Sequence, residues 1–230
     1  MSKITISVII PVLNSHEAVR RQVRHLENVM PPFSEIVIVD DGSDPPICKT
    51  LSLPETNNVT FILETTQDFR PWTQPRARNI GAAKARGDIL AFIDVDHIVS
   101  QQAIYELEYF YDDRIDWPRI PASLNARGYI EPAAGEARGP AAGIFAMRRK
   151  AFDRLRGFDE RFCGEYGFDD LDLLERYNKL AKRGQVSQSV TSVNPVYYWS
   201  GETPAFHDLP HEPSTRNVQI LSEKANEPVS

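Results

Sequence analysis

The sequence predicts an α/β fold in which a single, mostly parallel sheet is flanked by helices. Short apolar runs alternate with helical periodicity over the first hundred residues, as in sheets whose strands are buried on both faces. The chain has 230 residues, of which 41% are hydrophobic and 25% charged, so it can form a substantial core. These observations favour one domain with right-handed crossovers between strands.

Four strands are expected in the first hundred residues. Each is a short run rich in Ile, Val or Leu that ends at a turn-forming residue. The first run ends at Pro11, which lacks the N–H that a central strand uses for pairing. We place the strands at 4–10, 36–39, 59–63 and 89–93.

Helices are expected between these strands. Asn14 and Glu17 have the spacing of a capping box, and apolar residues then recur at helical period until Pro31-Pro32. A second helix is expected over 75–85, before Gly87. This alternation places the carboxyl ends of the strands along one edge of the sheet, where ligands bind in folds of this class.

The second half is expected to be less regular. Residues 112–143 are rich in Pro, Gly and Ala and predict an irregular segment. The polar residues after Gly201 predict no particular element. Helices are expected over 101–111, 150–155 and 169–183, and strands over 144–147, 186–190 and 196–199.

Composition excludes some classes of protein. A net charge of −6 argues against a general nucleic-acid binder. No apolar run approaches the roughly 20 residues of a membrane span, although peripheral membrane association stays open. Cys48 and Cys163 indicate no disulfide framework, and the residues after Met1 do not resemble a secretory signal. We therefore expect a cytoplasmic protein.

Asp94 and Asp96 follow the strand at 89–93. Where a strand ends and its alternation relaxes, both carboxylates can turn toward one point. Unpaired they would repel each other, so a hard divalent cation with oxygen ligands is the natural neutraliser. The alternative is that both are ordinary strand-end or helix-capping acids, but their position after a core strand favours a metal site.

Asp40 and Asp41 follow the strand at 36–39 and precede Gly42. Their oxygens could accept hydrogen bonds from a nucleobase or from ribose hydroxyls, and glycine lets the backbone pass close to a ligand. The alternative is an ordinary turn in which Asp and Ser43 act as caps, and this motif taken alone favours it.

Asp169, Asp170 and Asp172 begin the helix at 169–183. Acids at a helix N-terminus interact favourably with the dipole, by about 0.3–1 kcal/mol each. Asp172 and Arg176 have i,i+4 spacing and are expected to form a structural ion pair. Three acids in four residues exceed what capping needs, so a carboxylate here could act as a general base beside a cleft.

Basic residues and histidines give weaker signals. Arg76 and Arg78 lie on one turn of the helix at 75–85 and could reach a phosphate, although an exposed helix face explains them equally well. His207 and His211 could supply a third metal ligand, but surface histidines are the simpler explanation. The chain lacks a P-loop and a Gly-x-Gly-x-x-Gly motif, so neither NTP hydrolysis nor dinucleotide redox chemistry is indicated.

Taken together, these motifs resemble family 2 glycosyltransferases of the GT-A fold. The resemblance covers roughly residues 4–183, in family order, and its last part is closest to the subgroup of chondroitin polymerase and the polypeptide N-acetylgalactosaminyltransferases. The opening strand of the family corresponds to 6–14, and its base-and-ribose turn corresponds to 39–43. The approach to a metal-binding Asp-x-Asp corresponds to 76–96, and the acceptor side corresponds to 157–160 together with 169–173.

The resemblance implies an inverting, metal-dependent glycosyltransferase that uses Mn²⁺ or Mg²⁺. It would transfer a hexosyl or N-acetylhexosaminyl group from a nucleotide-diphosphate sugar, with a UDP-sugar favoured, to a hydroxyl acceptor, with a glycan or polysaccharide favoured over other acceptors. One domain over 1–230 would then contain a nucleotide-sugar-binding half at 1–100, an acceptor-binding half at 101–200 and a tail at 201–230.

On the donor side, the resemblance assigns roles position by position. Asp41, together with Asp40, would contact the base and the ribose. Pro11 and Asn14, at the end of the opening strand, would lie beside the nucleotide.

The metal on the diphosphate would be held by Asp96, with Asp94 near the ribose or the metal. The family subgroup has a further histidine ligand in its tail, which corresponds to His211 or His207, and His211 is the better local match.

On the acceptor side, Asp170 matches the catalytic base and Asp169 an acid that binds a sugar. Arg76 or Arg78 would assist the leaving phosphate. The subgroup often has Trp-Gly-Gly-Glu-Asp where this chain has Tyr-Gly-Phe-Asp-Asp at 166–170, so sugar selectivity cannot be carried over.

Two other functions remain open at this point. A sugar-nucleotidyltransferase would have a Gly-rich basic loop after the first strand, which residues 11–14 do not resemble. A non-catalytic sugar-nucleotide-binding subunit would bind the donor without hydrolysing or transferring it. For a transferase, Trp117 and Tyr129 in the irregular segment are expected to line the acceptor side, since loops at strand ends carry specificity.

Overall fold

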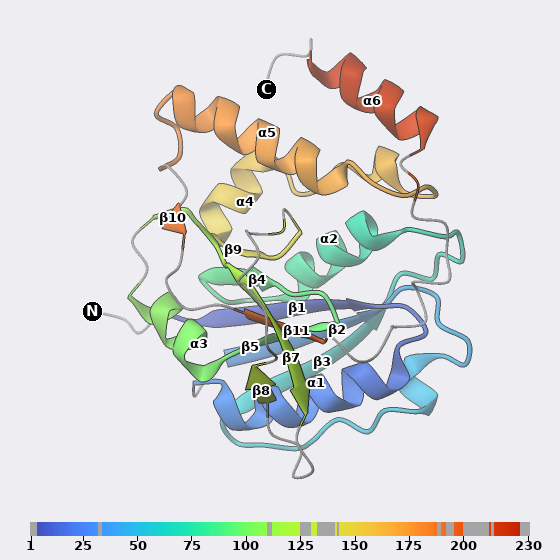
Figure 1. Cartoon of the computed structure of the whole chain (residues 1–230), viewed down its shortest axis with the longest axis vertical. Coiled ribbons are helices and arrows are strands. Elements are labelled where there is room, and N and C mark those ends of the chain that lie inside the picture. The colour runs from blue at the N-terminus through green and yellow to red at the C-terminus, as the bar shows by residue number, and fades with distance from the viewer. Residues whose placement is uncertain are drawn as a thin grey trace.

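The structure is a computed structural model that describes residues 4–31, 34–109, 112–124, 130–132, 141, 143–187, 190–191, 196–199, 212 and 214–225. Within these residues the strands form two sheets, and helices cover both faces of the larger one (Figure 1). In this part of the chain, no helix has both the length and the apolar character needed to cross a membrane.

The larger sheet has seven strands in the order β10-β6-β9-β4-β1-β2-β3. From β4 to β3 all neighbours are parallel, whereas β9 is antiparallel to β4 and β6. The mostly parallel sheet predicted from the sequence is therefore confirmed. Its strands are β1 (Ile6–Val12), β2 (Ser34–Asp40), β3 (Val59–Thr65), β4 (Ile89–Phe92), β6 (Arg114–Asp116), β9 (Phe145–Arg148) and β10 (Val190–Thr191).

The smaller sheet has the order β5-β11-β7-β8. Its strands β7 and β8, together with β6, lie in 112–143, so the prediction of an irregular segment there is wrong. These strands have three to six residues, and two of them contain proline, so their alternation is too short to detect in the sequence. The strands are β5 (His97–Val99), β7 (Arg119–Leu124), β8 (Ile130–Pro132) and β11 (Val196–Trp199).

Two apolar layers enclose the larger sheet. Successive residues of a strand point to opposite faces, so Val8 and Ile10 pack with α1 (His16–Val29) and α3 (Gln101–Glu108). Ile9 between them packs on the other face, which carries three helices (Figure 1). Those helices are α2 (Gln74–Lys84), α4 (Arg149–Leu155) and α5 (Asp169–Lys182).

Two short 3-10 helices and a C-terminal helix complete the fold. These are η1 (Ile47–Lys49), η2 (Glu160–Phe162) and α6 (Thr215–Ala225). The sequence did not predict α6, which packs against η2. Helix α5 begins at the predicted residue, and Arg176 Nη2 lies 2.8 Å from Asp172 Oδ2, which confirms the predicted i,i+4 ion pair.

Two predictions about the first crossover are wrong. Strand β1 does not end before Pro11 but continues to Val12. Strand β4 pairs with β1 only as far as Ile9, so the N–H that Pro11 lacks has no partner to lose on the β4 side. Asn14 does not cap α1, whose N-cap residue is Ser15. Instead, Asn14 has a φ of 52°, and its Oδ1 accepts a 2.7 Å hydrogen bond from the Asp44 N–H.

Candidate active site

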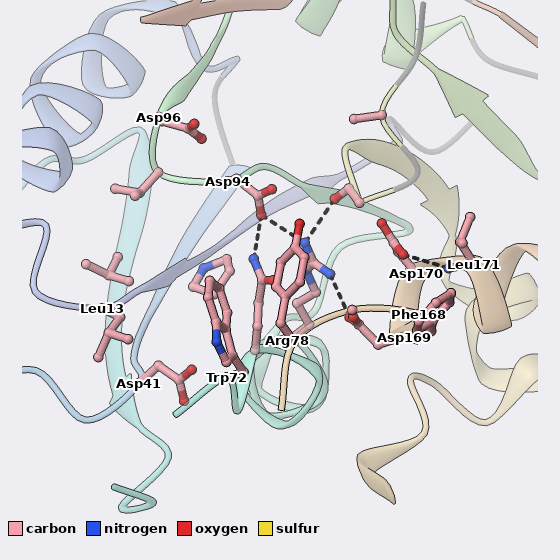
Figure 2. A pocket seen from close by; sticks show the side chains of 18 residues that line it. Leu13, Asp41, Trp72, Arg78, Asp94, Asp96, Phe168, Asp169, Asp170 and Leu171 are labelled. Atoms are coloured by element: carbon pink, nitrogen blue, oxygen red, sulfur yellow. Dashed lines mark hydrogen bonds and ion pairs between the residues drawn. The ribbon is translucent and has the colours of Figure 1, made fainter. Parts of the chain in front are cut away.

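A cavity of about 470 Å³ lies where the carboxyl ends of β1, β2 and β4 meet the first turns of α2 and α5 (Figure 2). Because these three strands are parallel, their carboxyl ends share one edge of the sheet. Pro11 belongs to the lining at the end of β1. The acidic residues that line the cavity are Asp41, Asp94, Asp96, Asp169 and Asp170.

Asp94 and Asp96 enter the cavity from the segment that follows β4 (Figure 2). Asp94 Oδ1 accepts hydrogen bonds from Gln74 Nε2 at 2.8 Å and from Arg78 Nη2 at 2.9 Å. Asp96 Oδ1 lies 2.7 Å from Nδ1 of the buried His97. Burial raises the pKa of Asp94, although the Arg78 guanidinium beside its carboxylate opposes this rise. The contacts with Gln74 and Arg78 hold the Asp94 side chain in a fixed orientation, and the contact with His97 does the same for Asp96.

The chemistry of this acidic pair suits a divalent cation. Mg²⁺ and similar hard cations take oxygen ligands, and one or two carboxylates with substrate phosphates and water are a usual set. Asp94 and Asp96 fit that pattern. Within the described residues, no group of three His, Cys, Asp or Glu side chains could hold a metal ion. His207 and His211 lie outside the described residues, and their role stays a prediction.

Arg78 lies in the floor of the cavity with a side chain that is 2% exposed. Its guanidinium contacts Asp94 and also lies 3.2 Å from Asp169 Oδ2 (Figure 2). The guanidinium carbon of Arg78 lies 5.1 Å from the centroid of the Phe158 ring, and Arg78 Nη2 donates a hydrogen bond to the Gly143 carbonyl. A methyl group at Gly143 would come within 2.8 Å of Arg78 Nη2, so glycine there makes room for the guanidinium.

Arg78 is therefore a buried link between β4 and α5. In the sequence it was a candidate for direct phosphate contact. Arg76, the second candidate, does not line the cavity, and its Nη1 lies 3.8 Å from Glu160 Oε2. Helical spacing explains the difference, because residues two apart point to different sides of a helix.

Asp41 lies at the other end of the cavity, at the carboxyl end of β2 (Figure 2). It is 5% exposed and accepts a hydrogen bond from the Thr73 hydroxyl. Burial raises the pKa of Asp41 to about 7, although hydrogen bonds from Thr73 and Thr66 oppose this rise. A ligand that donates an N–H to Asp41 would favour its charged form.

Asp40 does not line the cavity. Its Oδ1 accepts the Ser43 N–H at 2.9 Å, and its Oδ2 accepts the Ile47 N–H at 2.8 Å. Asn14 is likewise outside the lining, where its N–H donates to Ser43 Oγ at 2.9 Å. Both residues organise the loop that follows β2. For Asp40 this is the structural alternative, an ordinary turn in which the aspartate acts as a cap.

Asp169 and Asp170 open α5 and face the cavity from the side opposite Asp41 (Figure 2). Burial raises the pKa of Asp169 to about 6, against the lowering effect of Arg78. Asp170 Oδ1 accepts the Leu171 N–H at 2.7 Å, which orients that carboxylate at the helix start. The preceding Phe168 has a φ of 74°, and this turn directs both acids into the cavity.

Two aromatic residues that line the cavity, Trp72 and Tyr166, have no role among the predictions from the sequence. Trp72 precedes α2 with a φ of 54°, and its ring centroid lies 4.8 Å from that of Tyr166. Their sequence positions gave no signal, because the contact joins segments far apart in the chain. Trp117, expected on the acceptor side, is instead fully buried in the core with α1 and α3, and Tyr129 lies outside the described residues.

The chain matches known proteins at the level of family and of fold. The model of the family described as glycosyl transferase family 2 matches residues 7–122. A second family model, described as the N-terminal domain of galactosyltransferase, matches residues 134–197. A comparison with curated protein sequences gives no match.

Solved structures show the same fold at low sequence identity. A crystal structure of S. aureus TarS 1–349 in complex with UDP-GlcNAc is 15% identical, with a TM-score of 0.57 over 90% of this chain and 61% of that one. The chain thus spans about three fifths of that relative's length. A crystal structure of a mycobacterial protein is also 15% identical, with a TM-score of 0.52 over 88% of this chain and 69% of that one.

Proposed function

Because the chain belongs to glycosyl transferase family 2, as its sequence motifs predict, we propose that it transfers a sugar from a nucleotide-diphosphate sugar to a hydroxyl group. One observation carries the proposal. Asp41 and Asp170 lie at opposite sides of one cavity, with Asp94 between them, so that base recognition, diphosphate binding and proton abstraction each have a carboxyl group (Figure 2).

The nucleotide would bind at the β2 end of the cavity. Asp41 is buried there and can accept a hydrogen bond from the N–H of a base such as uracil. The UDP-GlcNAc in the TarS crystal structure makes a UDP-sugar the first donor to test.

The diphosphate would bind beside Asp94 and Asp96, which would hold Mn²⁺ or Mg²⁺. Such a cation, when bound, would stabilise the negative charge that develops on the leaving diphosphate. Arg78 already contacts Asp94 and Asp169, so its part is to orient these carboxylates rather than to bind phosphate.

The acceptor would enter from the α5 side. Asp170 would remove the proton from an acceptor hydroxyl, whose oxygen forms a bond to the anomeric carbon as the bond to the diphosphate breaks. Attack from the side opposite the leaving group inverts the anomeric configuration. We assign the base to Asp170 because the Asp169 carboxylate is committed to Arg78.

Calorimetry of UDP binding with and without MnCl₂ tests the donor and metal roles together. We expect wild-type protein to bind UDP at least about tenfold more tightly with Mn²⁺, because a cation removes repulsion between diphosphate and carboxylates. The Asp96→Ala variant should lose this difference, whereas Asp153→Ala, an exposed residue on α4, should keep it. Mn²⁺-dependent tightening that persists in Asp96→Ala would contradict the metal role, and no UDP binding by wild type would contradict the donor role.

A further inference from the structure

Helix α6 lies beside the segment 161–167, which leads into the two acids at the start of α5 (Figure 1). We propose that Asn217 on α6 is a positioning residue that holds this segment, and through it Asp170, in the geometry needed for transfer. This inference rests on the proposed function, because it assigns a role to the support of the proposed base.

The segment adopts a backbone that needs external support. Gly164, Gly167 and Phe168 have φ values of 104°, 94° and 74°. Glycine adopts such values without cost, but a bulky residue such as phenylalanine does so only when its surroundings enforce the conformation. Because Phe168 directly precedes Asp169, the direction of both acids depends on what fixes the segment before it.

Asn217 supplies that fixation from outside the segment. Its side chain is fully buried, and Nδ2 lies within hydrogen-bond distance of three carbonyl oxygens, those of Phe162 at 3.3 Å, Glu165 at 3.0 Å and Gly167 at 2.9 Å. Its Oδ1 accepts from Arg216 Nη1 at 3.3 Å, which sets the orientation of the amide. Carbonyls that a helix or strand would normally pair are thus satisfied by one side chain.

Neighbouring contacts hold α6 itself in place. Arg216 Nη2 donates to the Arg161 carbonyl at 2.7 Å, and its Nη1 donates to the Cys163 carbonyl at 3.3 Å. At the other end of α6, Lys224 Nζ lies 2.5 Å from Asp159 Oδ2 and 2.7 Å from Asp172 Oδ1. Because Asp172 belongs to α5, α6 is fixed both to the segment and to the helix that carries the acids.

Hydrogen–deuterium exchange of the full chain tests the positioning role directly. In Asn217→Ala, amides in 161–170 should exchange at least tenfold faster, while β1 and β2 keep wild-type rates. Arg216→Met, which alters an exposed side chain and removes two contacts to the same segment, should show a smaller increase. Gln219→Ala, on the exposed side of α6, is the matched control and should change nothing.

Kinetics then separate positioning from simple stability. With UDP-GlcNAc, Mn²⁺ and water as the acceptor of the sugar, Asn217→Ala should lower the kcat for UDP release at least tenfold and leave the donor KM within twofold. Wild-type exchange at 161–170, or an unchanged kcat despite faster exchange, would overturn the inference. If Asn217→Ala does not fold, Arg216→Met decides, and its wild-type exchange would also overturn it. If wild type does not bind UDP, the donor role in the proposed function fails, and exchange alone still decides whether Asn217 holds the segment.

Discussion

Adjacent aspartates at the end of β2 have different surroundings because the strand turns them to different sides. Asp40 accepts two backbone N–H groups of the following loop, whereas Asp41 faces the cavity beside Thr73. Asp40 therefore shapes the loop, and only Asp41 is available to a ligand in the cavity. Substitution of Asp40 is therefore expected to disturb the loop, and substitution of Asp41 to disturb the cavity.

The buried carboxyl of Asp41 predicts a pH effect on stability. Burial raises its pKa from 3.8 to about 7, so between these values the folded state keeps a proton that the unfolded chain has lost. The contribution of Asp41 to stability therefore falls as pH rises from about 4 to about 7. Relative to wild type, Asp41→Asn should be more stable at pH 8 than at pH 5, by on the order of 2–4 kcal/mol.

Urea denaturation at both pH values measures this difference. Asp153→Asn, at an exposed position, should track wild type at each pH. A stability difference between Asp41→Asn and wild type that is the same at pH 5 and pH 8 would show that Asp41 does not titrate in this range.

The Asp170→Asn variant isolates the proposed base. The amide keeps the size of the side chain but cannot accept a proton at neutral pH, so transfer should fall by about 10²–10⁴-fold. Calorimetric affinity for UDP with Mn²⁺ should stay within twofold, because Asp41, Asp94 and Asp96 are untouched. Asp153→Asn serves again as the matched control. Transfer at the wild-type rate in Asp170→Asn would rule out Asp170 as the base.

At the scale of elements, one buried side chain joins α2, β4 and α5. Arg78 on α2 contacts Asp94 after β4 and Asp169 on α5, and glycine at position 143 leaves room for it. These side-chain contacts bring a helix start and a strand end together, and within the described part of the chain no backbone hydrogen bond joins the two. The proposed donor and acceptor sides of the cavity are thus linked by an ion-pair cluster.

Arg78→Met should cost both stability and activity. Removing the buried guanidinium leaves the partly exposed carboxylates of Asp94 and Asp169 without their shared cation, and breaking a buried pair costs at most about 3–5 kcal/mol. Arg76→Met, two residues away on the same helix and outside the cavity, should cost less than about 1 kcal/mol. Urea denaturation compares the two, and equal losses would mean that Arg78 stabilises only as an ordinary helix residue.

At the scale of the whole molecule, the sequence predicted the regular parts of the fold. Long apolar strands and the periodic helices α1, α2 and α5 have local patterns that the final packing preserves. Strands β6 and β7 are short and pair with strands that are distant in the sequence, and β8 has only three residues and pairs with β7, so no local pattern marks them. Helix α6 follows a polar, Pro-rich stretch and is held by side-chain contacts with η2 and α5, which a sequence cannot reveal.

The candidate site could be predicted in its composition but not in its connections. Strand ends of a parallel sheet converge, so the clustering of acids near Asp41 and Asp94 followed from the order of elements. The contact between Arg78 and Asp169 joins residues 91 positions apart and leaves no trace in local spacing. Likewise, the loop contacts of Asp40 and Asn14 depend on which way each side chain points, and spacing does not determine that.

The Arg78 link also sets an order of events during synthesis on the ribosome. When α2 has emerged, Arg78 has neither partner, since Asp94 follows 16 residues later and Asp169 follows 91 residues later. A nascent chain can therefore form the β1–β2–β3 layer, and with it the end of the cavity that contains Asp41, at an early stage. The charge of Arg78 stays solvated during that stage. The guanidinium becomes buried only after α5 has been made, so the complete cavity is among the last features that the growing chain can acquire.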